Sequence, residues 1–255
     1  MKIYKQPLYY EIAFGFVNPK KQIDSFEKII KKFSKIKVKR FLDIACGPSL
    51  QLREIVRRGY EGIGLDSSPQ MLRYLEKKAK EENFKVETVK ADMINFKLKK
   101  KADFAFIMMG SLNFGSNDEF LSHLNSVGFS LNKGSLYLIQ NQVLNWKNPV
   151  KQQWTSKRGG ITIKTVFDWK FKNIIDQVYE EKITLYVDDN GKKEKIINKK
   201  NLKFIFPQEF KTLVELNRNF EFLGWWYGNC NTWHLNVPLK ENKISRGNII
   251  IVRRK

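Results

Sequence analysis

The segment FLDIACGPSLQLREIVRRGYEGIGLD, residues 41–66, decides the fold. It contains two short apolar runs, and each run leads to an acid, Asp43 in the first and Asp66 in the second. Gly47 and a proline turn the chain after the first run, and a helix-like stretch that ends at Gly59 separates the two runs. The segment therefore predicts a strand, a tight turn, a helix and a second strand.

The alternation of strands and helices continues on both sides of this segment. Apolar residues recur at intervals of three and four over residues 20–36, which predicts an amphipathic helix. Ser68 and Pro69 have the residue types of an N-cap and a first helical position, and a helix over 117–131 is expected to be capped by Asn117 or Asp118. Further strands are expected at 85–92, 102–110 and 133–141. This alternation predicts a doubly wound, mostly parallel sheet that is covered on both faces.

The pattern changes after residue 145. Residues 146–206 contain strand-like runs without intervening helices, and Asn190-Gly191 is a strong signal for a hairpin turn. A helix that begins at Pro207 and two more strands then restore the earlier pattern. The sequence thus predicts a Rossmann-like α/β core of residues 1–145 and 207–255 with a seven-stranded sheet, and an inserted antiparallel β subdomain over 146–206.

The turn at Gly47 lies where an open parallel sheet binds its ligand, beyond the carboxyl ends of the strands. Gly47 allows the backbone to approach a ligand closely, and the helix that follows offers free N–H groups. Asp66 lies 19 residues after Gly47, close to the offset of roughly 20 residues at which an acid binds a ribose diol. An adenosine ligand is therefore expected.

The patterns that bind phosphate are missing from the sequence. Ser49 stands where a dinucleotide-binding loop has its second glycine, and the chain contains no G-x-x-x-x-G-K-[ST] loop. Adenosine without a phosphate-binding loop points to S-adenosylmethionine.

The order and spacing of these motifs resemble the class I S-adenosylmethionine-dependent methyltransferases. The resemblance is strongest to the small-molecule branch with a β-rich insertion (methyltransferase domain 25-like), which includes sugar-amine and glycine N-methyltransferases. The segments that carry it are LYYEIAF (8–14), LDIACGPS (42–49), GYEGIGLDSSPQML (59–72) and VKADM (89–93). One position departs from the family, because Pro48-Ser49 stands where the first motif usually has a second glycine, and proline removes a backbone donor.

The resemblance implies a set of cofactor-binding residues. Asp43 would contact the amino end of S-adenosylmethionine, Asp66 the ribose, and Asp92 with Met93 the adenine. The full expected set is Tyr9, Asp43, Ala45, Cys46, Gly47, Pro48, Ser49, Asp66, Ser67, Met71, Ala91, Asp92, Met93, Met108, Met109 and Gly110. Cys46 is expected to be a small residue beneath the cofactor rather than a nucleophile, and core packing is an open alternative for Met71.

The catalytic candidates are Tyr10 and His234. Tyr9 and Tyr10 would close over the cofactor, and His234 is expected in a loop, whereas His123 is expected to be partly exposed on a helix. Methyl transfer from a sulfonium mainly requires proximity and orientation, and a desolvated site favours the neutral amine that must attack. Aromatic residues of the insertion would exclude water there, or form its core: Trp154, Phe167, Trp169, Phe171, Tyr179 and Tyr186. The expected products are a methylated small molecule, through its amine nitrogen, and S-adenosylhomocysteine.

The composition leaves two other classes of function open. The chain has 47 Lys and Arg against 26 Asp and Glu, a net charge of +21, which fits either nucleic-acid binding or a lysine-rich composition. An RNA methyltransferase is the main alternative, although Met109-Gly110-Ser111-Leu112 replaces the Asn/Asp-Pro-Pro-aromatic motif of enzymes that methylate base amines. A catalytically inactive adaptor with the same fold is the third possibility, and the complete set of Asp43, Gly47, Asp66 and Asp92 argues against it.

The sequence also gives expectations about membrane spans, the cellular compartment and disulfide bonds. No apolar run approaches the roughly 20 residues of a membrane span, and we see no signal peptide. The two cysteines, Cys46 and Cys230, lack the spacing of a disulfide framework or a metal site and suit a reducing cytoplasm. A cytoplasmic monomer or homodimer without metal is therefore expected.

Overall fold

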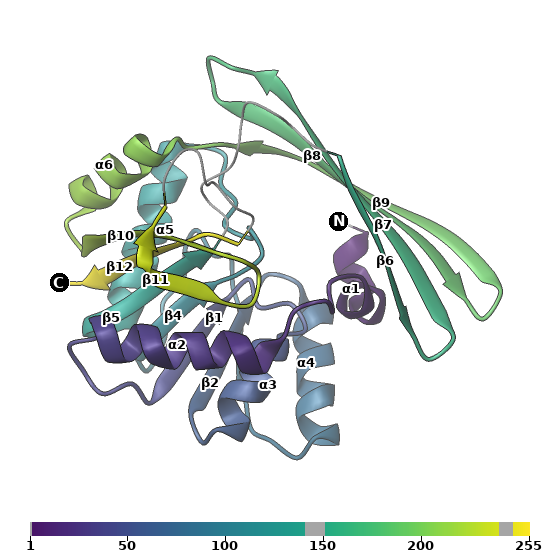
Figure 1. The fold of residues 1–255 in the computed structure, drawn as a ribbon, viewed down its shortest axis with the longest axis horizontal. Coiled ribbons are helices and arrows are strands. Elements are labelled where there is room, and N and C mark those ends of the chain that lie inside the picture. The colour runs from purple at the N-terminus through teal and green to yellow at the C-terminus, as the bar shows by residue number, and fades with distance from the viewer. Residues whose placement is uncertain (1, 141–150, 240–246) are drawn as a thin grey trace. The chain divides into compact units, whose positions relative to one another are not determined.

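The computed structural model describes residues 2–140, 151–239 and 247–255 (Figure 1). The chain divides into two compact units, one of residues 1–17 and 145–204 and the other of residues 18–144 and 205–255. The sequence prediction assigned residues 1–145 to the core, whereas the structure groups the first 17 residues with the inserted segment. The predicted start of the insertion at residue 146 lies outside the described residues.

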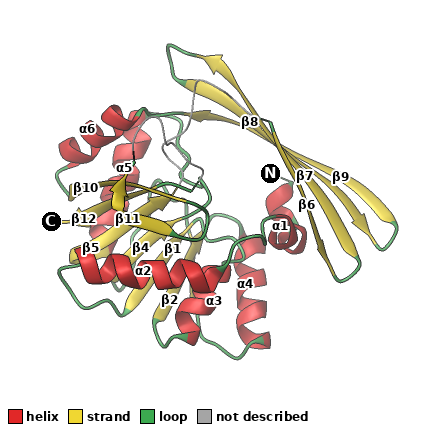
Figure 2. Ribbon diagram, viewed as in Figure 1, coloured by secondary structure: helices red, strands yellow, loops and turns green. Residues whose placement is uncertain are grey.

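The larger unit contains an eight-stranded sheet in the order β11-β10-β12-β5-β4-β1-β2-β3 (Figure 2). Its strands are β1 (Arg40–Ile44), β2 (Glu61–Asp66), β3 (Glu87–Lys90), β4 (Ala102–Ile107), β5 (Leu131–Gln140), β10 (Phe220–Gly228), β11 (Trp233–Pro238) and β12 (Ile249–Arg254). Strands β1 to β5 are parallel to one another, and β12, β10 and β11 are added to β5 in antiparallel pairings. The sheet has one strand more than predicted, because β11 replaces the loop expected around His234.

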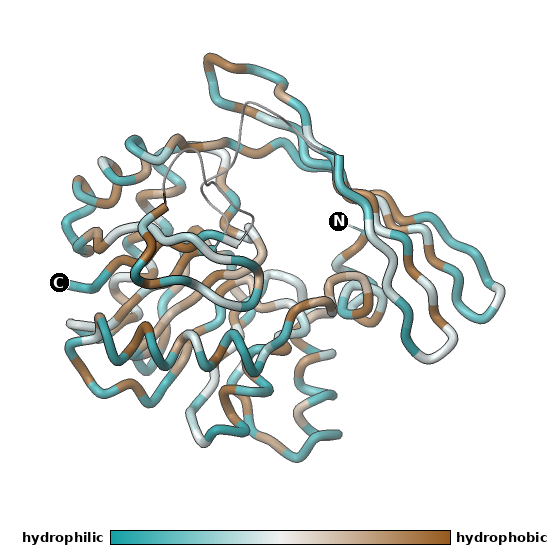
Figure 3. Tube along the Cα trace, in the orientation of Figure 1, coloured by the Kyte–Doolittle hydropathy of each residue, from teal (hydrophilic) through white to brown (hydrophobic). Residues whose placement is uncertain are grey.

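Helices cover both faces of this sheet, as the alternating pattern predicts. They are α2 (Pro19–Phe33), α3 (Leu50–Arg57), α4 (Pro69–Glu81), α5 (Asn117–Ser130) and α6 (Pro207–Asn217). Phe104 and Phe106 of β4 belong to a buried cluster with α2, α3 and α4, whereas Ala105 and Ile107 belong to a cluster with α5 and α6. The alternation of apolar and polar residues along α2 is visible in Figure 3. The predicted doubly wound fold is confirmed.

Short-range signals set the starts of the helices around the candidate site. The hydroxyl of Ser68 accepts from the N–H of Met71 at 3.4 Å, so the predicted N-cap of α4 is found. The hydroxyl of Ser49 caps α3 in the same way, since it accepts from the N–H of Leu52 at 3.1 Å. The cap of α5 is Ser116 rather than Asn117 or Asp118. Ser116 has extended backbone geometry and its hydroxyl accepts from the third residue of the helix at 3.1 Å.

The smaller unit is a four-stranded antiparallel sheet in the order β6-β7-β8-β9. Its strands are β6 (Gln152–Arg158), β7 (Ile161–Asn173), β8 (Val178–Asp189) and β9 (Lys192–Lys203). Asn190 and Gly191 join β8 to β9 with φ of 51° and 92°, the geometry that a tight hairpin turn requires. The short helices η1 (Ile3–Lys5) and α1 (Pro7–Ala13) contribute Ile3, Ile12 and Ala13 to the buried cluster of this sheet. The predicted antiparallel sheet is confirmed.

Candidate active site

The turn after β1 holds three residues in a left-handed conformation. Ala45, Gly47 and Ser49 have φ of 55°, 53° and 34°. Such angles are strained for alanine and serine and are often found at ligand-binding turns. Ser49 stands where the family's first motif has a glycine, and it adopts a conformation that glycine tolerates. Its hydroxyl compensates by capping α3 and by donating to Oδ2 of Asp43 at 2.6 Å.

Asp66 joins the first two sequence motifs. One oxygen of its carboxylate accepts from the N–H of Gly47 at 2.8 Å, and the other accepts from the N–H of Ser68 at 2.8 Å. The parallel pairing of β1 with β2 brings the two strand ends together and allows these bonds. The carboxylate is half-buried, so it fixes the turn and still presents surface to a ligand.

Asp43 is a buried acid with little local compensation. It is 3% exposed, and among the described residues the side-chain donor to its carboxylate is the Ser49 hydroxyl. Burial raises the pKa of Asp43 to about 8, the bond from Ser49 opposes that rise, and the nearby charge of Asp66 adds to it. Two acids in so small a region favour a cationic ligand, although the protein as a whole is strongly basic.

The side chain of Cys46, which belongs to this turn, is buried, and its place beneath the cofactor stays a prediction. Its side chain is 8% exposed, and a Cβ added at Gly64 would lie 2.9 Å from its sulfur. Burial raises the pKa of the Cys46 thiol, so the sulfur stays protonated and is a poor nucleophile. The geometry supports a packing role for this residue.

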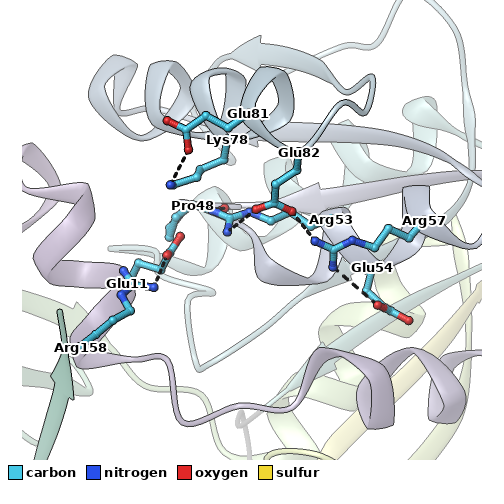
Figure 4. Close-up of polar contacts among 9 residues, drawn as sticks. All are labelled: Glu11, Pro48, Arg53, Glu54, Arg57, Lys78, Glu81, Glu82 and Arg158. Atoms are coloured by element: carbon cyan, nitrogen blue, oxygen red, sulfur yellow. Dashed lines mark hydrogen bonds and ion pairs between the residues drawn. The ribbon is translucent and has the colours of Figure 1, made fainter.

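Arg53 braces the turn from the side of α3 and was missed by the sequence prediction. Its guanidinium is buried, donates to the carbonyl of Pro48 at 3.4 Å and pairs with Glu82 at 3.3 Å (Figure 4). Arg57 also pairs with Glu82, which caps the end of α4. An arginine in a helix with a partner 29 residues away gives no local signal of this contact.

The third motif adjoins the second. The N–H of Ala91 donates to the carbonyl of Asp66 at 3.2 Å, and Asp92 is exposed and accepts from the N–H of Ile94 at 2.9 Å. Met93 is half-buried. The structure therefore brings together the acids assigned to ribose and adenine, which lie at the ends of neighbouring strands.

His123 is fully buried, which corrects the expectation of a partly exposed helix histidine. Its Nδ1 lies 2.8 Å from the carbonyl of Met93, and its Nε2 lies 2.8 Å from the hydroxyl of Tyr137. Since a carbonyl only accepts, Nδ1 carries the proton and Nε2 accepts from Tyr137. Burial lowers the pKa of His123 to about 4, so the ring is neutral near pH 7.

Serines on α5 hold the rest of the segment that follows β3. The hydroxyls of Ser122 and Ser126 donate to the carbonyl of Ile94 at 3.0 and 3.2 Å. The hydroxyls of Ser126 and Ser130 accept from the N–H groups of Phe96 and Leu98, both at 3.2 Å. Together with His123, this polar stripe of α5 fixes residues 93–98 beside the predicted adenine site.

The end of β4 forms a second strained turn. Met109 and Gly110 have φ of 59° and 68°, and Met108 is buried. The N–H of Met109 donates to Oε1 of Gln140, the last residue of β5, at 2.9 Å. Gln140 is 1% exposed, and its Nε2 has no hydrogen-bond partner among the described residues. The sequence prediction placed the methionyl end of the cofactor at this turn but did not find Gln140.

The remaining residues of the predicted site lie on several different elements. The hydroxyl of Tyr9 donates to Asp189 at 2.8 Å, and the Tyr10 ring packs on its neighbours within the smaller unit. Met71 is fully buried and offers no surface to a ligand, which favours the alternative of core packing. Ser67 is exposed next to Asp66. His234 is exposed on β11, where its ring stacks on Tyr227 at 5.8 Å.

A hollow of about 380 Å³ lies elsewhere, on the four-stranded sheet. Its lining is Thr162, Lys164, Tyr186, Val187, Asp188, Lys193, Glu194 and Lys195. It contains none of the predicted cofactor residues, so the strand-end acids locate the candidate site better than this hollow does. Within residues 2–140, 151–239 and 247–255, no group of three or more His, Cys, Asp or Glu is placed to hold a metal ion. In the same ranges, no helix is long and apolar enough to cross a membrane.

Comparison with known proteins identifies the domain. Residues 41–134 match the family model of a methyltransferase domain. A search of curated proteins found no significant match. Among solved structures, an S-adenosylmethionine-dependent methyltransferase from Clostridium acetobutylicum ATCC 824 is 14% identical with a TM-score of 0.77, over 97% of this chain and 96% of that one.

Two further solved structures are similar along nearly their whole length. DesVI of Streptomyces venezuelae is 15% identical with a TM-score of 0.77, over 100% of this chain and 99% of that one. The sugar N-methyltransferase KedS8 from Streptoalloteichus sp. ATCC 53650 is 16% identical with a TM-score of 0.74, over 97% and 92%. At these sequence identities the structural similarity establishes a shared fold. The match to the family model assigns residues 41–134 to a methyltransferase domain. The chain therefore matches a methyltransferase domain in this segment and has the fold of S-adenosylmethionine-dependent methyltransferases, as its motifs predict.

Proposed function

We propose that this protein transfers the methyl group of S-adenosylmethionine to the amine nitrogen of a small molecule. One observation supports the cofactor site above all: Asp43, Gly47 and Asp66 form a single hydrogen-bonded turn at the ends of β1 and β2. This turn combines an acid for an ammonium group, an acid for a ribose diol and a backbone that a ligand can approach.

The residues present fit this cofactor. The buried carboxylate of Asp43 has the Ser49 hydroxyl as its side-chain donor among the described residues, and its pKa is raised to about 8. The ammonium group of the methionyl end would supply the positive charge that this carboxylate lacks. The sequence offers no phosphate-binding loop, and S-adenosylmethionine has no phosphate to bind.

The chain contributes orientation and exclusion of water. S-adenosylmethionine, when bound, supplies a methyl group on a sulfonium, which an amine displaces in line. Asp66 and Asp43 would fix the ribose and the amino end, and the backbone of Met108–Gly110 would bound the methionyl part. Such positioning is the main need of this reaction because the leaving group is good. No protein nucleophile is required, which agrees with the protonated, buried thiol of Cys46.

The acceptor is proposed from a structural relative. KedS8, which shares the fold, is a sugar N-methyltransferase. We propose that residues 146–206 cover the acceptor, that Tyr9 and Tyr10 help to close the site, and that His234 is a secondary catalytic candidate. An amine nitrogen would lose its proton more easily in such a desolvated site.

A turnover screen tests the proposal. The protein is incubated with S-adenosylmethionine and a panel of small amines, alcohols and carboxylates, and S-adenosylhomocysteine is measured. We expect turnover with amines and none with the matched alcohols. Turnover that occurs with alcohols or carboxylates and with no amine would contradict the assigned acceptor atom. Failure to bind S-adenosylmethionine in calorimetry would contradict the cofactor site itself.

A further inference from the structure

The chain turns sharply after β4, in a conformation that is unfavourable for one of its residues. The N–H of Ser111 donates to the carbonyl of Met108 at 3.0 Å and closes the turn. Between them, Met109 and Gly110 have φ of 59° and 68°. Positive φ at both central positions is the geometry of a type I′ turn, which favours Asn, Asp or Gly. Gly110 suits this turn, but methionine is strained in it, so Met109 needs an interaction that holds it there.

Gln140, the last residue of β5, supplies this interaction. Its Oε1 accepts from the N–H of Met109 at 2.9 Å, and its side chain is 1% exposed. Leu136 and Leu138, which precede Gln140 at two-residue spacing, belong to the same buried apolar cluster as Met108. Because side chains alternate along a strand, Gln140 lies on this apolar face of the sheet. An apolar side chain would fill such a position without the cost of burying an amide.

The orientation of the Gln140 amide follows from its contact with Met109. A backbone N–H can only donate, so the oxygen of the amide faces Met109 and the nitrogen points elsewhere. The Nε2 of Gln140 is buried and has no hydrogen-bond partner among the described residues. A buried donor without an acceptor is costly, and such groups are rare in native proteins. The bond to the strained turn therefore accounts for an amide at this position.

The strand register places Gln140 on the same face of the larger unit as Asp43. Asp43 of β1 lies opposite Phe106 of β4, and Phe106 lies opposite Leu138 of β5. Gln140 is two residues beyond Leu138, so it lies on that face and nearer to the edge at which the parallel strands end. The turn that Gln140 holds therefore lies on β4, the strand next to the one that carries the acid expected to bind the amino end of the cofactor.

We propose that Gln140 is a positioning residue for the amino-acid end of S-adenosylmethionine. Its bond to Met109 fixes the backbone of residues 108–110, which bounds the methionyl part of the bound cofactor. The adenosine half is expected at Asp66 and Asp92, and β4 and β1 separate β5 from the strand that ends at Asp66. Gln140 therefore acts on one end of the cofactor and not on the other. The inference rests on the proposed cofactor site and adds a residue that lies outside its sequence motifs.

Two ligands that share the adenosine group provide the test. S-adenosylhomocysteine carries the amino-acid end and 5′-methylthioadenosine lacks it, and calorimetry measures the affinity of the protein for each. Gln140→Met keeps the length of the side chain and removes the acceptor. We expect it to weaken S-adenosylhomocysteine about five- to tenfold, because one hydrogen bond at the turn is lost, and to leave 5′-methylthioadenosine unchanged. Asp66→Asn is the matched control and should weaken both ligands by a similar factor.

Further variants separate positioning from folding. Gln140→Glu keeps an acceptor oxygen for Met109 and should bind S-adenosylhomocysteine more tightly than Gln140→Met. Gln140→Asn withdraws the amide from the turn and should repeat the selective loss if Gln140→Met does not fold. Equal weakening of both ligands, or of neither, in a folded Gln140→Met or Gln140→Asn protein would overturn this inference and leave the proposed function intact. Failure of the wild type to bind S-adenosylhomocysteine would overturn the proposed cofactor site, and this inference with it.

Discussion

Ser49 combines backbone strain with two compensating hydrogen bonds. Its φ of 34° suits glycine better than serine, but its hydroxyl caps α3 and donates to Asp43. We expect Ser49→Ala to lower the free energy of unfolding by about 1–2 kcal/mol, since it keeps the strain and loses both bonds. Ser49→Gly loses the same bonds but relieves the strain, so it should be the milder change in urea denaturation. A glycine variant less stable than the alanine variant would contradict this reasoning.

Asp43 should release a proton when the cofactor binds. Its pKa of about 8 in the free protein means that it is mostly protonated at pH 7, and a bound ammonium group favours the ionised form. We expect affinity for S-adenosylmethionine to rise as pH increases from 6 towards 8. Calorimetry at pH 7 in buffers of different ionisation enthalpy should detect this release, and Asp43→Asn should abolish it. Identical heats in all buffers would refute the assignment.

Asp66 has two tasks, because it holds the turn at Gly47 as well as the expected ribose. We expect Asp66→Ala to weaken S-adenosylmethionine binding by about 2–5 kcal/mol, from the loss of hydrogen bonds to a charged acceptor. Asp66→Asn keeps one acceptor oxygen and should fall between the alanine variant and the wild type. Calorimetry measures both, and circular dichroism checks that the sheet remains. Unchanged affinity in a folded alanine variant would exclude the predicted role.

At the scale of elements, α5 makes the segment after β3 sensitive to acid through His123. The pKa of this histidine falls from 6.5 to about 4 on burial, so the folded state binds fewer protons than the unfolded state between these values. Its contribution to stability is therefore complete above pH 6.5 and is lost as pH falls through 4, a change of about 3 kcal/mol. His123→Gln should be less stable at pH 7 and should lack this part of the pH dependence. Equal slopes in wild type and variant would show that His123 does not titrate on unfolding.

The elements that sequence patterns predicted well are those with local causes. Ser49 and Ser68 cap the helices that they precede, and Asn190-Gly191 makes the expected turn. The strand β11 was missed because a short edge strand with asparagine and proline has weak local signals, and its pairing with β10 is irregular. His123 was placed on a solvated face because its partners, Met93 and Tyr137, come from other elements.

The site shows the same division between local and distant causes. The acids Asp43, Asp66 and Asp92 were found because strand ends converge at one edge of a parallel sheet. Arg53, Gln140 and the serines of α5 were not found, because they act on the backbone of segments distant in sequence.

At the scale of the whole molecule, the net charge of +21 permits a direct test of the RNA alternative. The lysines around Tyr186 and acids such as Asp188 lie on one face of the four-stranded sheet, opposite the face that packs with η1 and α1. We expect bulk tRNA to bind in a filter assay at low salt only, and the binding to vanish near 150 mM salt, because counterion release weakens with ionic strength. Retention of tRNA at physiological salt, together with methylation of it, would favour an RNA methyltransferase.

Because α1 packs with the four-stranded sheet, it is synthesised well before the strands that cover its apolar side. Ile12 and Ala13 pack with Ile163 and Leu185, yet β6 begins at Gln152, 139 residues after the end of α1. At translation rates of about 5–20 residues per second, the helix emerges roughly 10–30 s before its partners exist. During that interval the parallel sheet can begin to form while the apolar side of α1 stays exposed to solvent. The nascent chain therefore offers a chaperone a short apolar helix, and the helix becomes inaccessible once the last hairpin closes.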